Sequence, residues 1–324
     1  MATRGAAARL IVRRMPRCGE FPTVPRRLGS SRLESLPSFH LDRGMSVARA
    51  LMSAHAEADD LPARTNYDLK EEVRAYWSQR SETFDLSYGH KIRSDAELDV
   101  WKALISSHWR ARPGDRVIEL ASGTGEVTRI LLALGCSVDG IDLCEPMIAR
   151  ARAKHVGASA RFLLGDAENT MMPDDHYDAA ICRHLVWTLP DPARALADWW
   201  RVLRPGGSLV VIDGDWVNKS FKARLLGRLS RLVDRMSGAS VPWDQAAHER
   251  IMRGVHFRKG LKARDLEAML AQAGFTDIRV GALHGIKRRQ FASASWSERL
   301  RLLAAYDQTF IISARKPGRN AAGE

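Results

Sequence analysis

The chain has 324 residues, of which 45% are hydrophobic, and it carries 50 Lys and Arg against 38 Asp and Glu. This length suits one large domain or two small ones, and no apolar run approaches the roughly 20 residues that cross a bilayer, so we do not expect a membrane-spanning protein. The four cysteines, Cys18, Cys136, Cys144 and Cys182, have neither paired nor metal-ligand spacing. We therefore expect reduced thiols in a cytoplasmic protein and no metal site.

The net charge of +12 is unevenly distributed along the chain. Residues 1–215 carry 29 basic and 29 acidic side chains, whereas residues 216–324 carry 21 Lys and Arg against 9 Asp and Glu. The C-terminal third therefore holds the whole excess. We expect any electrostatic partner to bind there.

Residues 1–60 differ in kind from the rest. They contain ten arginines, no lysine, four prolines and no periodic apolar pattern. This composition is typical of a mitochondrial transit peptide if the source is eukaryotic, and an over-extended start before an internal methionine is the alternative. We predict a disordered Arg-rich extension over 1–60 and one folded domain over 61–324.

The first strand and the turn after it indicate a ligand site. Val117–Leu120 predicts a strand buried on both faces. Gly123 and Gly125 follow, and glycine lets the backbone turn sharply and lets a ligand approach the main chain. The helix from Val127 to Leu134 presents its N-terminal amides to that ligand. This unit predicts a nucleotide-like cofactor site.

The rest of the domain alternates between helices and strands. Helices are also expected over Leu69–Phe84, Asp95–Trp109, Glu145–Lys154, Ala193–Val202 and Ala263–Ala273, and strands over Ser137–Ile141, Ala160–Leu164, Tyr177–Arg183, Ser208–Ile212, Phe275–Leu283 and Phe310–Ala314. The last strand is expected to close the sheet as an edge hairpin with the strand before it.

Three carboxylates near strand ends indicate which cofactor binds. Glu119 would repel a pyrophosphate but pair with an ammonium, and Asp142 at the end of the second strand is placed to accept ribose hydroxyls. Asp166, just after the third strand, can accept from the exocyclic amine of adenine. The turn also departs from the G-x-G-x-x-G pattern of dehydrogenases. These features favour S-adenosylmethionine, which has an ammonium and no phosphate, over a dinucleotide.

With these residues the chain resembles the class I S-adenosylmethionine-dependent methyltransferases, in particular the ubiquinone/menaquinone-biosynthesis-like branch. Gly165–Glu168, Tyr177–His184 and Trp200–Asp213 match the family as well. The resemblance covers about residues 67–215. It implies a Rossmann-like α/β fold with helices on both faces of a seven-stranded sheet, in the strand order 3-2-1-4-5-7-6 with strand 7 antiparallel.

The resemblance also implies the site residues. Cofactor contacts are expected from Glu119, Ala121, Gly123, Gly125, Asp142, Asp166, Ala167 and Cys182. Ala121 stands where the family usually has its first glycine. Tyr88 and His90, in a region that closes over the cofactor, and Asp215 are the expected substrate contacts. His184 is the catalytic candidate because histidine titrates near neutral pH, and a histidine that only holds its loop is the alternative.

Residues 216–262 form an insertion between the fifth strand and the next helix. Phe221–Met236 predicts a basic amphipathic helix with one apolar stripe. We first interpret it as a lid whose stripe packs on the substrate pocket. Contact with an anionic membrane surface, or with an acidic substrate or nucleic acid, is the alternative.

The sequence therefore predicts transfer of a methyl group from S-adenosylmethionine to a small-molecule acceptor bound under this lid. An RNA methyltransferase that uses the basic C-terminal third, and a non-catalytic or dinucleotide-binding protein, are the alternatives. Enzymes that methylate amino groups of nucleic acids carry an Asn/Asp-Pro-Pro-aromatic motif after the fourth strand. This chain has Cys182-Arg-His184 there, which disfavours methylation of adenine N6.

Overall fold

The computed structural model describes residues 65–318 except 88, 219, 237–243 and 305–307. The predicted extension over 1–60 lies outside the described residues, and its boundary with the folded domain stays a prediction. None of the helices in the described ranges combines the length and the hydropathy that crossing a bilayer requires.

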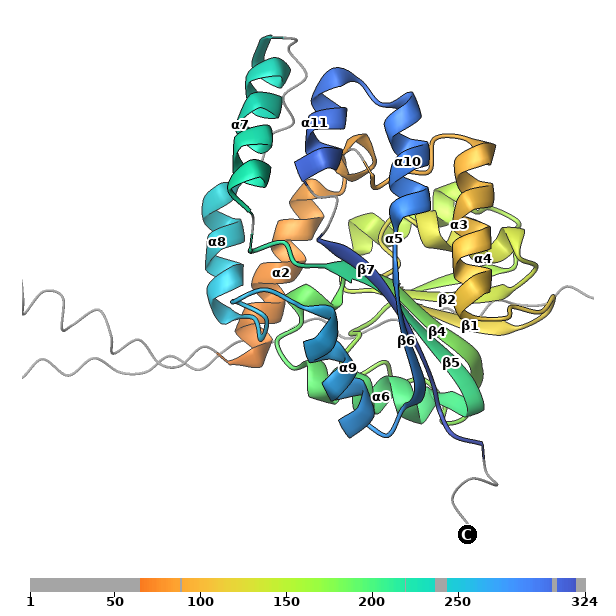
Figure 1. Ribbon diagram of the computed structural model, residues 1–324. Helices are drawn as coiled ribbons and strands as arrows, with labels where there is room; N and C mark the ends of the chain where they lie inside the picture. The colour runs from red at the N-terminus through yellow and green to blue at the C-terminus, as the bar shows by residue number, and fades with distance from the viewer. Residues whose placement is uncertain (1–64, 88, 219, 237–243, 305–307, 319–324) are drawn as a thin grey trace, which may run out of the picture. The chain divides into compact units, whose positions relative to one another are not determined.

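Seven strands form one sheet in the order β3-β2-β1-β4-β5-β7-β6 (Figure 1), as predicted. Neighbours among β1 to β5 are parallel, and β7 is antiparallel to both β5 and β6. The strands are β1 (Arg116–Leu120), β2 (Ser137–Asp142), β3 (Ala160–Leu164), β4 (Tyr177–Arg183), β5 (Leu203–Gly214), β6 (Thr276–Ala282) and β7 (Thr309–Arg315).

Helices cover both faces of this sheet (Figure 1). They are α2 (Asn66–Arg80), α3 (Asp95–His108), α4 (Glu126–Ala133), α5 (Glu145–Lys154), α6 (Pro192–Val202), α7 (Phe221–Met236), α8 (Gln245–Gly254), α9 (Ala263–Gln272), α10 (His284–Ser293) and α11 (Trp296–Ala304), with short 3-10 helices η2 (Phe84–Leu86) and η3 (Val186–Thr188).

Alternating side chains of β1 separate the two cores, because successive residues of a strand point to opposite faces. Ile118 packs in the core that includes Trp199 of α6 and Leu270 of α9. Val117 packs in the other core, with Ile105 of α3 and Ile130 of α4. Both faces of β1 are thus buried, which explains why its sequence reads as a nearly continuous apolar run.

The C-terminal part corrects one prediction. The helices α10 and α11 lie between β6 and β7, so these strands do not form a hairpin. β7 pairs with β5 on one side and with β6 on the other, as the predicted strand order requires. The edge strand at this end of the sheet is β6. Its side chains are mostly exposed, which suits an edge.

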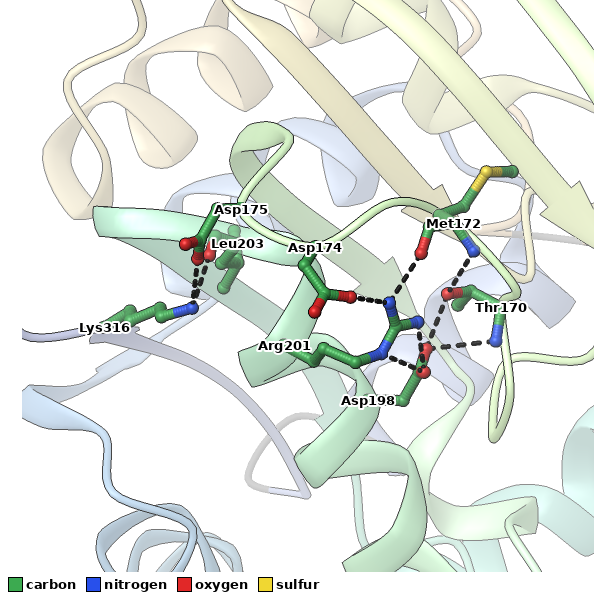
Figure 2. A network of polar contacts seen from close by, with 8 residues as sticks. All are labelled: Thr170, Met172, Asp174, Asp175, Asp198, Arg201, Leu203 and Lys316. Atoms are coloured by element: carbon green, nitrogen blue, oxygen red, sulfur yellow. Dashed lines mark hydrogen bonds and ion pairs between the residues drawn. The ribbon is translucent and has the colours of Figure 1, made fainter.

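A network of polar contacts fixes the segment between β3 and β4 (Figure 2). Arg201 of α6 pairs with Asp198 at 2.6 Å, and Asp198 accepts the hydroxyl of Thr170 at 2.6 Å. Lys316, just after β7, pairs with Asp175 at 2.6 Å. These contacts join the segment to α6 and to the chain after β7. The segment begins at Gly165 and contains Asp166, a predicted site residue.

Candidate active site

A cavity of about 600 Å³ lies at the carboxyl ends of the parallel strands. Two groups of residues line it. The group after β1, β2 and β3, called here the motif side, comprises Ala121, Gly123, Asp142, Leu143 and Gly165 to Glu168. The other group, called here the cap side, comprises Arg80, His90, Trp101, Arg183, His184, Trp216, Lys287, Arg301 and Thr309.

The two glycines of the turn differ in the space that surrounds them. Gly123 has a φ of +54°, and a Cβ there would meet only the Phe84 side chain, at 3.9 Å. Gly125 has a φ of +81°, and a Cβ there would lie 2.8 Å from His155 Nε2. Gly123 therefore leaves the backbone accessible to a ligand, whereas Gly125 is required for packing against His155.

Asp142 links the turn to the end of β2. One carboxylate oxygen accepts the Gly123 amide at 2.8 Å, and the other accepts the Cys144 amide at 2.9 Å. Burial raises the pKa of Asp142 to about 6, although these two amides act in the opposite direction. Each oxygen retains a lone pair, so the group can accept two hydroxyls of a ribose.

Lys70 of α2 forms ion pairs with two carboxylates of the motif side, Asp166 and Glu168. Its ammonium lies 2.6 Å from Asp166 and 2.5 Å from the buried Glu168. Glu168 also accepts the Asp191 amide at 2.7 Å, and the carbonyl of the buried Ala167 accepts the indole N–H of Trp199 at 2.7 Å. Sequence reasoning missed Lys70, because no local pattern relates it to a carboxylate 96 residues further along.

Glu119 and Cys182, two of the predicted cofactor residues, do not line the cavity, and neither does Gly125, which packs against His155. Glu119 is buried, its carboxylate accepts the Thr128 hydroxyl, and burial raises its pKa to about 8. Cys182 is fully buried in the core that includes Trp199. The structure thus places both side chains behind the site. Their contact with the cofactor stays a prediction.

His184 occupies a strained position just after β4. Its φ is +59°, a left-handed conformation that is uncommon for a residue with a Cβ and that concentrates at functional sites. Its ring lies 5.1 Å from that of Trp216 and 6.0 Å from that of His90. Nδ1 of His184 and Nδ1 of His90 are both buried without a hydrogen-bond partner among the described residues.

Both histidines are neutral at pH 7. Burial lowers the pKa of His90 to about 3, and the charges of Arg183 and Arg80 act in the same direction. Burial also lowers the pKa of His184 well below its usual value, with help from Arg183 and His90. A neutral histidine of low pKa is a weak general base, but it can donate or accept one hydrogen bond at each nitrogen.

Two arginines on the cap side lack carboxylate partners. Arg183 donates to the His90 carbonyl at 2.6 Å, and its guanidinium lies 5.5 Å from the centre of the Trp101 ring. Arg80 donates to the Tyr76 hydroxyl at 3.1 Å, while its Nε is buried without a partner. Neither arginine forms an ion pair with any described residue. The cap side is therefore suited to an anion.

The aspartates at the end of β5, Asp213 and Asp215, have structural contacts. Asp215 does not line the cavity, and its carboxylate accepts the Asn218 amide at 2.9 Å, which caps the turn before α7. Asp213 is buried and accepts the indole N–H of Trp216 at 3.1 Å, so it positions a cap-side ring. Burial raises the pKa of Asp213 to about 7. Tyr88, the other predicted substrate contact, lies outside the described residues.

The prediction that the α7 stripe packs on the pocket is wrong. Phe221, Leu225, Leu229, Leu232 and Met236 are exposed, and no described residue of α7 lines the cavity. The cavity is instead covered by Lys287 and Gln290 of α10 and by Arg301 and Leu302 of α11. From the predicted insertion only Trp216 and His248 reach it, among the residues that the structure describes.

Comparisons with known proteins agree with this geometry. A family model described as a methyltransferase domain matches residues 118–211. Demethylmenaquinone methyltransferase of Thermus thermophilus is 32% identical over 180 residues, which are 52% of this chain and 81% of that protein.

Two solved structures share the fold at low sequence identity. Phosphoethanolamine N-methyltransferase 2 of Haemonchus contortus has a TM-score of 0.53 and 16% identity, and the match covers 79% of this chain and 61% of that one, less than two thirds of its length. Geranyl diphosphate C-methyltransferase of Streptomyces coelicolor has a TM-score of 0.51 and 15% identity, with 79% and 100% coverage.

Fold, site and comparisons together define a class I S-adenosylmethionine-dependent methyltransferase. Within that class the chain belongs to the ubiquinone/menaquinone-biosynthesis-like branch. The matches favour neither a dinucleotide cofactor nor an RNA substrate. The motif side suits the cofactor, because Gly123 leaves its backbone accessible and Asp142 offers two acceptors.

Proposed function

We propose that the enzyme methylates a small acceptor that joins an anionic group to an apolar or aromatic body. The observation that carries this proposal is the pair Arg80 and Arg183, two cap-side cations without a carboxylate partner among the described residues. A desolvated cation is costly unless an anion neutralises it. An anionic acceptor would supply that charge.

Aromatic side chains around the cavity, on the cap side and next to it, support an aromatic or apolar body. Trp77, Phe84, Trp101, Trp187 and Trp216 line the cavity. Such rings bind flat or apolar groups through large contact areas and offset stacking. A purely ionic ligand would leave this surface unused.

On the motif side, we propose that Asp142 binds the ribose hydroxyls and that Asp166 and Ala167 contact the adenine. Gly123 would bring its backbone close to the cofactor. S-adenosylmethionine supplies an electrophilic methyl group on sulfur together with a good leaving group. The protein then has to hold the acceptor in line with that methyl group, which is a proximity effect.

On the cap side, we propose that neutral His184 and His90 orient the acceptor through their unpartnered Nδ1 atoms. Their lowered pKa values disfavour a role as strong bases. An acceptor whose anionic group is itself the attacking group has no proton to lose and needs no base, and Arg183 would favour this ionised form. An anionic acceptor is therefore consistent with the weak basicity of His90 and His184.

The names of the fold relatives are compatible with this class of acceptor. Phosphoethanolamine and geranyl diphosphate both carry phosphate groups. Demethylmenaquinone, named for the more similar relative, supplies the precedent for an apolar body. These names concern those proteins, and the acceptor of this chain rests on its own cap-side residues.

The test is a methyl-transfer assay on the full chain with acceptors in charge-matched pairs, for example a hydroxybenzoate and its amide. S-adenosylhomocysteine is measured as the product. We expect faster transfer to the anionic member of a pair. Arg80→Gln and Arg183→Gln should each lower kcat/KM for that member by about 10- to 100-fold, the usual loss of a charged hydrogen bond.

Arg194→Gln, an exposed arginine on α6, is the matched control. Affinity for S-adenosylhomocysteine should be unchanged in all three variants, because the arginines lie on the cap side. Equal rates for the charged and neutral members, unchanged by Arg80→Gln and Arg183→Gln, would contradict the anionic acceptor and leave the cofactor assignment intact.

A further inference from the structure

The helix α7 turns its apolar stripe away from the protein. Phe221 is 79% exposed, Leu232 is 54% exposed and Met236 is 81% exposed. Leu225 and Leu229 are exposed as well. These five residues are spaced so that they share one face of a helix. They form a continuous apolar surface along four turns, called here the α7 stripe.

The buried residues on the inward face of α7 are small or polar, while the apolar Leu226 and Val233 are half-buried. The buried residues are Ala223, Ser230 and Asp234. Ser230 donates to the Ser297 carbonyl of α11 at 3.0 Å, and Asp234 pairs with Arg301 of α11 at 3.3 Å. Specific polar contacts therefore hold α7 in the orientation that exposes the stripe.

A row of cations accompanies the stripe. Exposed basic side chains stand on the same helix at Lys222, Arg224, Arg228, Arg231 and Arg235. At 100° per residue, the four arginines fall side by side along one border of the stripe and Lys222 falls on the other. The one acidic residue of α7, Asp234, is buried and paired with Arg301. The exposed surface of α7 thus combines apolar and cationic character without any anion.

The positive charge of α7 indicates which kind of partner binds the α7 stripe. A second copy of the chain would bring another arginine row against the first. The N-terminal extension is also cationic, with ten arginines and six acidic residues in residues 1–60. An anionic bilayer surface complements both features, because apolar side chains enter the acyl boundary while arginines bind lipid phosphates.

We propose that α7 docks the enzyme, as a peripheral helix lying in the plane of the surface, on membranes that contain anionic phospholipids. Trp296, at the start of the helix α11 that packs on α7, is 76% exposed and would add an aromatic side chain near the interface. This inference is independent of the proposed acceptor.

The experiment is co-sedimentation of the full chain with two kinds of vesicle, phosphatidylcholine alone and phosphatidylcholine mixed with phosphatidylglycerol. We expect binding to the anionic vesicles and a decrease as salt is raised. Phe221→Ser/Leu232→Ser should weaken that binding at least about tenfold. Arg228→Gln/Arg231→Gln should weaken it by about 10- to 30-fold, which is the effect of two surface cations.

Matched controls remove equivalent groups elsewhere. Val156→Ser/Met171→Ser removes two apolar side chains that are more than 80% exposed, and Arg150→Gln/Arg194→Gln removes two exposed arginines. Both should bind vesicles like the wild type. Because all these side chains are exposed, every variant should keep the wild-type Tm and affinity for S-adenosylhomocysteine.

Three results would overturn the proposal. The first is a wild-type protein that does not bind anionic vesicles, and the second is unchanged binding in the stripe and arginine variants. The third is a wild-type dimer, seen by light scattering, that Phe221→Ser/Leu232→Ser converts to a monomer. The third result would assign the stripe to a copy of the same chain.

Discussion

The motif side and the cap side of one cavity satisfy their polar groups in opposite ways. On the motif side, Asp142 accepts two backbone amides and Asp166 pairs with Lys70. On the cap side, Arg80, His90 and His184 each have a buried polar atom without a partner among the described residues. Buried polar groups are costly when they are left unpaired. The motif side is therefore held by its own contacts, whereas these atoms of the cap side are available to the acceptor that we propose.

The largest expected effect is a pH dependence of the unfolding free energy. It comes from Glu119, the buried carboxyl group behind the motif side. The pKa of Glu119 is raised by burial to about 8, so the folded protein holds a proton there that the unfolded chain releases above pH 4.5. Relative to Glu119→Gln, the wild type should lose stability as pH rises from 4.5 to 8, by up to about 1.4 kcal/mol per pH unit.

Urea unfolding at several pH values without ligand measures this difference. Below pH 4.5 and above pH 8 the difference between wild type and variant should be constant. Asp95→Asn, which removes an exposed carboxylate, is the control and should give no such slope. A flat difference across the whole range for Glu119→Gln would show that Glu119 is ionised in the folded state.

The second effect removes the main cofactor contact proposed for the motif side. Asp142→Ala deletes the acceptor of the Gly123 and Cys144 amides as well as the proposed acceptor of the ribose hydroxyls. We expect affinity for S-adenosylhomocysteine to fall by about 1–3 kcal/mol, measured by calorimetry. Asp174→Ala, on the exposed surface, is the control. Unchanged affinity would remove Asp142 from the site.

The third effect addresses the cap side. His184→Asn keeps a residue that tolerates the left-handed backbone but removes the imidazole. With an accepted substrate, turnover should fall about tenfold because one orienting hydrogen bond is lost, while affinity for S-adenosylhomocysteine is retained. Wild-type turnover in this variant would assign His184 to the support of its loop.

The smallest effect tests the first position of the turn. Ala121 has a φ of +55°, a conformation that costs an L-residue about 1–2 kcal/mol. Ala121→Gly relieves that strain and adds unfolded-state entropy worth about 0.5–1 kcal/mol. Denaturant unfolding should therefore show a net gain of about 0.5 kcal/mol. A loss of stability would indicate that the Ala121 methyl group packs productively.

The glycine turn and the strand ends of the motif side could be predicted from the sequence because their signals are local, whereas their contacts with the cofactor stay a prediction. Each buried strand ends in a turn with a carboxylate nearby, and the pattern is contained in a few consecutive residues around Gly123 and Asp142. These local motifs also carry the family resemblance, and that resemblance implied the order of the strands in the sheet. Lys70 escaped notice because its partners are near only in space.

The helices α10 and α11 of the cap side could not be predicted in the same way. Besides Ile286, α10 buries Lys287 and Gln290, both of which line the cavity. A helix that turns polar residues toward a cavity has no regular apolar stripe, and periodicity is the main sequence signal for a helix. For α7, the apolar stripe correctly predicted a helix. It did not predict that the stripe faces away from the protein.

The position of β7 has a consequence for how the sheet is completed. This strand follows all the others in the sequence, yet it lies between β5 and β6. While the chain is being synthesised, β5 therefore remains an unpaired edge, and β6 has no neighbour, until residues 309–315 leave the ribosome. A stop codon between Ala282 and Thr309 would leave an open sheet edge prone to aggregation, with the strand β6 detached.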